Sequence, residues 1–129
     1  MIDGKTEDRR HYVHLLNKSP EQHVVLEAAD GHSGLELCRS QPIDCVILAY
    51  DLPDISGLRV LIQLVPRPRY AKTAVILLSN HPIPGMAVLA KNNGAQAYMV
   101  KSDVTDDQLE AAIHKALATV SSTRKQARS

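Results

Sequence analysis

Short apolar runs punctuate the chain at residues 24–26, 43–49, 74–78 and 97–100. Each run is rich in β-branched residues or bounded by turn signals. Because the apolar residues are continuous and do not alternate with polar ones, they indicate strands that are covered on both faces. Only Met1 and Ile2 precede the first polar residue, Asp3. A further strand there, the first along the chain, would be short. The sequence leaves open whether this strand is vestigial or whether the chain is trimmed at its start.

Helical stretches separate these runs, at residues 7–17, 33–40, 57–64, 85–93 and 105–120. Gly94 is a candidate C-terminal glycine for the fourth helix. The last helix has the clearest signature, because Thr105 and Gln108 form a capping box and apolar residues follow at helical spacing. The polar, basic segment 121–129 predicts a disordered tail after a single domain of residues 1–120.

Strands that alternate with helices predict βαβ units, which give a parallel sheet with helices on both faces. We therefore expect a three-layer, doubly wound α/β fold with five strands. In such sheets the functional crevice lies at the carboxyl ends of the strands. The candidate residues follow the strands, at residues 3–5, 30, 49–54, 79–81 and 101–103.

Composition and charge narrow the classes of function. The 129-residue chain is long enough for one domain with one core, and its net charge of +1 argues against electrostatic binding to nucleic acid or an acidic membrane. Four Tyr without Phe or Trp make a poor surface for base stacking. The longest apolar run, about six residues, is far below the ~18–20 that cross a bilayer. With Cys38 and Cys45 as its only cysteines and no signal peptide, the chain is expected in the cytoplasm.

Residues at the expected strand ends fall at particular distances from Ala49. Four, eight, 30 and 52 residues further on stand Pro53, Gly57, Ser79 and Lys101. With these spacings, and with Ile2-Asp3-Gly4 and the segments 44–54, 75–79, 94–95 and 98–101, residues 1–120 resemble the receiver domain of two-component response regulators. This is the fold of the chemotaxis response regulator. The resemblance implies the flavodoxin-like strand order 2-1-3-4-5.

Receiver domains accept a phosphoryl group on an aspartate, which the resemblance places at position 49. An acidic cluster holds Mg²⁺, and a lysine and a hydroxyl contact the phosphoryl group. Here the acceptor position is Ala49, and Gly4 stands where a second acidic residue is expected. The pocket is therefore expected to be vestigial, with these remaining members: Asp3, Gly4, Asp51, Ser79 and Lys101. Asp3 alone makes a weak metal site, so we expect no cofactor, and Lys101 is free to pair with Asp3.

These departures predict a pseudo-receiver, which is not an enzyme and signals by protein–protein contact without phosphorylation. The resemblance implies a docking face over residues 85–120, a sensor kinase or signalling effector as partner, and possible homodimerisation through this face. The candidate contact residues are Lys91, Asn92, Tyr98, Lys101 and Ser102. The alternative is a phospho-accepting receiver whose acceptor was mutated to Ala, naturally or by engineering, or displaced to Asp51. A third hypothesis is nucleic-acid binding by the basic tail and by the basic loop that holds Arg67, Arg69 and Lys72. The sequence shows no helix-turn-helix pattern, which counts against this hypothesis.

Other candidate residues have simpler interpretations. We expect Asp54 to be a solvated loop residue or a cap for the helix that begins near Ser56. His11 and His14 are expected to be solvated surface residues, since no third ligand lies near them in the sequence. Two prolines in the segment 82–84 restrict the loop after the fourth strand, which fits a locked surface or a tight turn. Without a phosphoryl group, Tyr98 is expected to keep one rotamer.

Overall fold

The computed structural model describes the backbone of residues 1–128 and the side chains of residues 1–121. The helices are α1 (Thr6–Lys18), α2 (Gly31–Ser40), α3 (Gly57–Leu64), α4 (Met86–Asn92) and α5 (Asp106–Arg128), with a 3₁₀ turn at Pro68–Tyr70. The strands are β1 (Cys45–Ala49), β2 (Ala74–Ser79) and β3 (Ala97–Val100). Among the described residues, no helix is both long and apolar enough to span a membrane.

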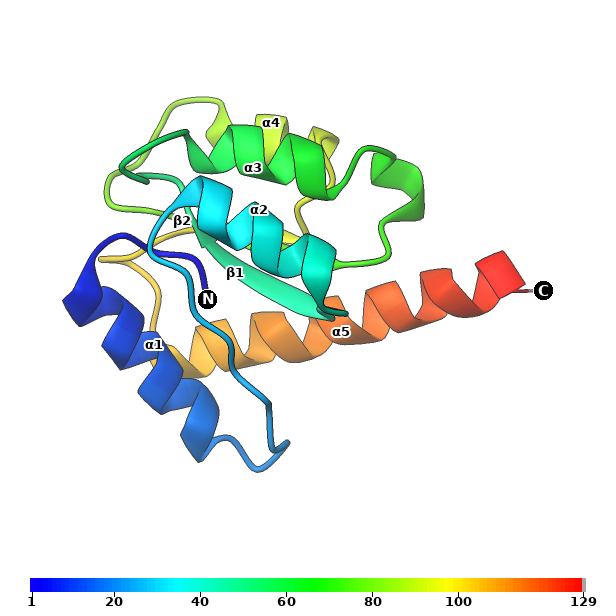
Figure 1. The fold of residues 1–129 in the computed structure, drawn as a ribbon, viewed down its shortest axis with the longest axis horizontal. Helices are drawn as coiled ribbons and strands as arrows, with labels where there is room; N and C mark the ends of the chain where they lie inside the picture. Colours follow the sequence, from blue (N-terminus) through cyan, green and yellow to red (C-terminus); the bar gives the residue numbers. More distant parts are fainter. Residues whose placement is uncertain (129) are drawn as a thin grey trace.

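The three strands form a parallel sheet in the order β1-β2-β3, with Val46 opposite Val75 and Leu77 opposite Tyr98. Helices cover both faces: α1 and α5 lie below the sheet in Figure 1, and α2, α3 and α4 lie above it. Successive strand residues point to opposite faces, so the sheet contributes to two buried clusters. The expected three-layer α/β arrangement is therefore present.

The expected five-stranded sheet is not confirmed, because within the described residues 1–128 only three segments form strands. Ile2 makes isolated parallel bridges to Ala28 and to Leu48, so the first two expected strands are reduced to single bridges beside β1. The prediction of a strand at residues 24–26 was wrong, and Val24 is 92% exposed. The backbone contact of this segment falls further along, where Ile2 pairs with Ala28.

The helix ends follow the expected signals more closely. Gly94 has a left-handed φ of 98° after α4, as its C-terminal position requires. At the start of α5, the Thr105 N–H donates to the Gln108 side chain at 2.9 Å, and the Gln108 N–H donates to the Thr105 hydroxyl at 3.1 Å. The structure differs at residues 121–128, where α5 continues through the segment expected to be disordered, because neither Gly nor Pro interrupts the helix there. Residue 129 lies outside the described residues.

Gly57 positions the end of β1, where the site lies. An added Cβ at Gly57 would lie 2.3 Å from the Ala49 carbonyl oxygen and 2.7 Å from the Tyr50 Cα. These are backbone atoms, which cannot rotate away as a side chain does. Helix α3 therefore approaches the end of β1 closely only because residue 57 has no side chain.

Substitution of this glycine tests the close approach. We expect Gly57→Ala to lower the free energy of unfolding by about 3 kcal/mol, because the methyl group must push α3 away from β1. Urea unfolding followed by circular dichroism measures the change. Gly85→Ala is the control, since Gly85 has a φ of 75° but open space around it, and left-handed strain alone costs about 1 kcal/mol. Equal losses in the two variants would contradict the steric explanation.

Candidate functional site

Three sequence-predicted residues meet at the carboxyl ends of the strands. Ala49 ends β1, Ser79 ends β2, and Asp3 follows the Ile2 bridge beside β1. All three are almost completely buried, with Ala49 and Asp3 each 1% exposed and Ser79 0% exposed. The Ala49 N–H donates to the Ile2 carbonyl at 2.9 Å, which fixes the end of β1 beside the segment that carries Asp3.

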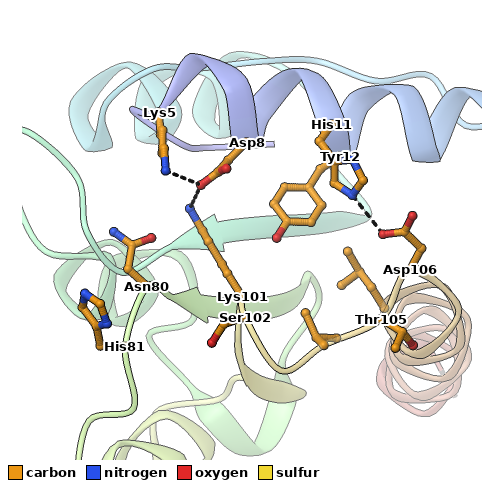
Figure 2. Close-up of a pocket in the computed structure, with 12 residues that line it drawn as sticks. Lys5, Asp8, His11, Tyr12, Asn80, His81, Lys101, Ser102, Thr105 and Asp106 are labelled. Carbon is orange, nitrogen blue, oxygen red and sulfur yellow. Dashed lines mark hydrogen bonds and ion pairs between the residues drawn. The ribbon is translucent and has the colours of Figure 1, made fainter.

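Lys101, directly after β3, reaches back over this edge to two carboxylates. Its Nζ donates to Asp3 Oδ2 and to Asp8 Oδ2, both at 2.8 Å. The pairing with Asp3 agrees with the sequence-based expectation. The Asp8 contact was missed, because Asp8 lies on α1 outside the receiver pattern and 93 residues from Lys101. Figure 2 shows the Lys101 ammonium next to the Asp8 carboxylate, with Lys5 on its other side.

Electrostatics keep this ammonium charged. Burial alone would lower the pKa of Lys101, but the hydrogen bonds that its ammonium donates to Asp3 and Asp8, together with their negative charges, raise this pKa above its usual value. The other oxygen of Asp3, Oδ1, accepts the Lys5 N–H at 2.9 Å. Both oxygens of the buried Asp3 carboxylate are therefore already engaged by the chain itself.

The donor set around Ala49 does not fit Mg²⁺, which favours octahedral oxygen ligands. Ala49 and Gly4 carry no side-chain oxygen, and both Asp3 oxygens accept hydrogen bonds. A side chain at position 4 would also be crowded, since a Cβ there would lie 3.0 Å from the Pro53 ring and 3.2 Å from the Ala29 carbonyl oxygen. Within the described part of the chain, no group of three His, Cys, Asp or Glu residues is placed to hold a metal, His11 and His14 included.

Ser79 and Tyr98 form the second polar contact of the edge. The Ser79 hydroxyl donates to the His81 carbonyl at 2.7 Å and lies 2.7 Å from the Tyr98 hydroxyl. Because the serine proton is used, Tyr98 must donate to Ser79, and its oxygen accepts the Ile83 N–H at 3.3 Å. This directed chain holds the β2–α4 loop, with its two prolines, against β3.

Asp51 and Asp54 both follow β1, but their carboxylates accept hydrogen bonds from different parts of the chain. Asp51 is exposed and accepts the Asn80 N–H at 3.1 Å, so it bridges the loops after β1 and β2. Asp54 is an exposed loop residue, as one of its two interpretations expected, and it does not cap its own helix: it accepts the N–H groups of Gly31 and His32, both at 2.8 Å, at the start of α2. Ser56 caps α3 instead. Only the packing of α2 beside α3 reveals this contact.

The expected docking residues are not all equally accessible. Lys91 and Asn92 are exposed on α4, and Ser102 is exposed in the β3–α5 loop. Tyr98 is half-buried and bonded to Ser79, and the Lys101 side chain is only 11% exposed. A cavity of about 500 Å³ opens beside Lys101, between α1 and the β3–α5 loop, and Tyr12, His81 and Ser102 help to line it (Figure 2).

Comparison with known proteins places this site in a family. The family model described as "Response regulator receiver domain" matches residues 1–114. The nitrate/nitrite response regulator protein NarL of Escherichia coli (strain K12) is 31% identical over 118 residues, which are 92% of this chain and 53% of the relative. The transcriptional regulatory protein UhpA of the same strain is 33% identical over 114 residues, covering 88% and 55%. The chain thus spans about half the length of these relatives.

Solved structures agree. The signal receiver domain of an HD domain-containing protein from Pseudomonas fluorescens Pf-5 superposes with a TM-score of 0.82 at 28% identity, covering 94% of each chain. The signal receiver domain of the putative response regulator NarL from Mycobacterium tuberculosis gives a TM-score of 0.79 at 29% identity, covering 91% of this chain and 92% of that one. This chain belongs to the response regulator receiver domain family, in two-component signalling.

The Asp54 cap generates a pH-dependent prediction. Burial would raise the pKa of this carboxyl, but the hydrogen bonds from His32, Gly31 and Ile55 lower it from 3.8 to about 2. A carboxyl group whose pKa is lower in the folded than in the unfolded state stabilises the fold at pH values above its unfolded-state pKa. This stabilisation is lost as the pH falls through the folded-state pKa. Asp54→Asn replaces one accepting oxygen with an NH₂ group, so we expect a lower urea midpoint at pH 7. The difference from the parent chain should shrink between about pH 5 and pH 2.

Glu36→Gln serves as the control, because Glu36 is 74% exposed and lies 3.9 Å from Arg39 on the surface of α2. Its urea midpoint should follow that of the parent chain at every pH. A loss in Asp54→Asn that stays constant from pH 7 to pH 2 would show that the carboxylate charge does not act as described.

Proposed function

We propose that this receiver domain is a pseudo-receiver, which signals by protein–protein contact without accepting a phosphoryl group. The single observation that carries the proposal is the buried methyl group of Ala49 at the end of β1. A methyl group offers no nucleophile for phosphoryl transfer and no oxygen for a metal. The fold around it is that of a receiver, so the scaffold is present while the acceptor is missing.

The contacts of Lys101 support the same proposal. Phosphoryl transfer requires positive charge that is free to stabilise the transferred group. Here the Lys101 ammonium is shared between the Asp3 and Asp8 carboxylates at 2.8 Å each. Both the nucleophile and the stabilising cation of the reaction are therefore withdrawn. The proposed function therefore involves neither a catalytic step nor bound Mg²⁺.

We place the docking face on α4, β3 and the start of α5, within residues 85–120. Lys91, Asn92 and Ser102 are exposed there and are the first candidates for direct contact. Tyr98 and Lys101 lie behind them and shape this face through their hydrogen bonds. A sensor kinase or a signalling effector is the proposed partner, and a second copy of the chain is a further possible occupant of the same face.

The alternative keeps phosphoryl transfer, with the acceptor lost by mutation or displaced to Asp51. The displaced acceptor has one observation in its favour: Asp51 lies two residues past Ala49, is exposed, and presents a carboxylate at the same edge of the sheet. One of its oxygens accepts the Asn80 N–H at 3.1 Å. Since the Lys101 ammonium is already paired with Asp3 and Asp8, this alternative lacks a free assisting cation.

Phosphorylation with a small-molecule donor distinguishes these possibilities. Incubation with acetyl phosphate and Mg²⁺, followed by intact mass spectrometry and Phos-tag electrophoresis, should leave the chain unlabelled. A receiver domain that has an aspartate at the acceptor position serves as the positive control. Stoichiometric, acid-labile phosphate on the chain would overturn the proposal, and its loss in Asp51→Asn would assign it to the displaced acceptor.

Reintroducing the carboxylate tests the other form of the alternative. We expect Ala49→Asp to remain unlabelled, because Gly4 supplies no second carboxylate and Lys101 is held by two others. Ala49→Asn is the matched control, with the same shape and no nucleophilic oxygen. Labelling of Ala49→Asp, alone or combined with Gly4→Asp, would support a receiver that lost its acceptor by mutation.

A further inference from the structure

Asp8 makes a contact that the receiver pattern does not require. It lies in the first turn of α1, where a carboxylate is favoured by the helix dipole, and its Oδ2 is 2.8 Å from the Lys101 Nζ. Its side chain is 26% exposed, against 11% for Lys101, so the pair is partly shielded from water. Lys5 Nζ, at 4.0 Å, is a second and more distant cation beside the same oxygen.

We propose that Asp8 is a positioning residue that compensates for the missing acceptor by fastening Lys101, and with it the β3–α5 loop, to α1. This inference rests on the proposed function, because it explains how the docking face keeps one conformation without a phosphoryl group. Asp8 acts through Lys101 and not by touching a partner. The Lys101–Asp8 pair is a contact between α1 and the loop that leads into α5.

The backbone around Lys101 makes the loop dependent on this side chain. The Lys101 N–H donates to the Ser79 carbonyl at 2.9 Å, and the N–H groups of Asp103 and Val104 both donate to the Val100 carbonyl, at 3.0 and 3.1 Å. These bonds close a tight turn at the end of β3. Ser102 and Asp103 are exposed, whereas Val104 packs against the apolar cluster that includes Leu109. The long side chain of Lys101 adds a polar contact between this turn and α1.

Asp3 alone does not supply this connection. Asp3 belongs to the segment beside β1, whereas Asp8 belongs to α1, so of the two carboxylates it is Asp8 that joins Lys101 to the helix. Without Asp8, the ammonium keeps Asp3 but loses one of its two charge-assisted hydrogen bonds. The buried Asp3 remains paired, so we expect the fold to survive and the loop to loosen locally.

A second pair joins the same elements and provides a matched control. His11, one helical turn after Asp8, lies 2.9 Å from Asp106 Oδ1 at the start of α5 (Figure 2). Both side chains are more than half exposed, at 54% and 53%. Exposed pairs contribute little to stability, so His11→Gln should leave the loop as it is.

Native-state hydrogen exchange on the full chain tests the proposal. In Asp8→Ala, we expect the amide hydrogens of Asp103 and Val104 to exchange about tenfold faster, while those of Ile76 and Leu77 in the centre of β2 are unchanged. The conservative Asp8→Glu should restore slow exchange, since it keeps a carboxylate within reach of Lys101. In His11→Gln, exchange in the loop should change by less than about twofold. A urea titration of each variant confirms that it is folded.

Two results would overturn the inference. One is unchanged exchange at residues 103–104 in Asp8→Ala. The other is faster exchange spread evenly over the whole chain, which would make Asp8 a general stabilising residue. Neither result bears on phosphorylation, which the acetyl phosphate assay on the parent chain measures separately. A labelled parent chain with a loosened loop in Asp8→Ala would overturn the proposed function and leave the Asp8 contact in place.

Discussion

The buried contact between the Lys101 ammonium and the Asp3 carboxylate is the interaction on which the carboxyl edge of this sheet depends. Removal of Lys101 would leave the buried Asp3 carboxylate without a counter-charge, which is strongly destabilising in a core. The contact joins the third residue of the chain to the end of β3, across 98 residues of sequence. Asp8 shares the same ammonium, so α1 is held at this edge as well.

A second polar contact secures the same strand. Tyr98 donates to Ser79 and accepts from Ile83, which keeps the β2–α4 loop against β3. Each of the two contacts therefore joins β3, or the loop after it, to another element: one through Tyr98 and one through Lys101. The proposed docking face on α4, β3 and α5 therefore rests on these hydrogen bonds.

The receiver scaffold is held by packing around the strand ends. The apolar core holds the strands in place, and Gly57 still lets α3 approach the end of β1. None of this packing depends on the identity of residue 49, because Ala49 fills its position with a buried methyl group. Family membership therefore follows from the scaffold, while function follows from the few side chains at the strand ends.

The sequence by itself determined the helices, the buried runs of β1, β2 and β3, and the identity of the edge residues, because these depend on local periodicity and fixed spacing. It also indicated the pairing of Lys101 with Asp3. Only the tertiary structure decided that residues 24–26 form no strand, that Asp54 accepts the first N–H groups of α2, and that Asp8 reaches Lys101. These outcomes depend on how separate elements pack, since a carboxylate bonds to whichever donor the fold brings within hydrogen-bonding distance, however far away it is in the sequence.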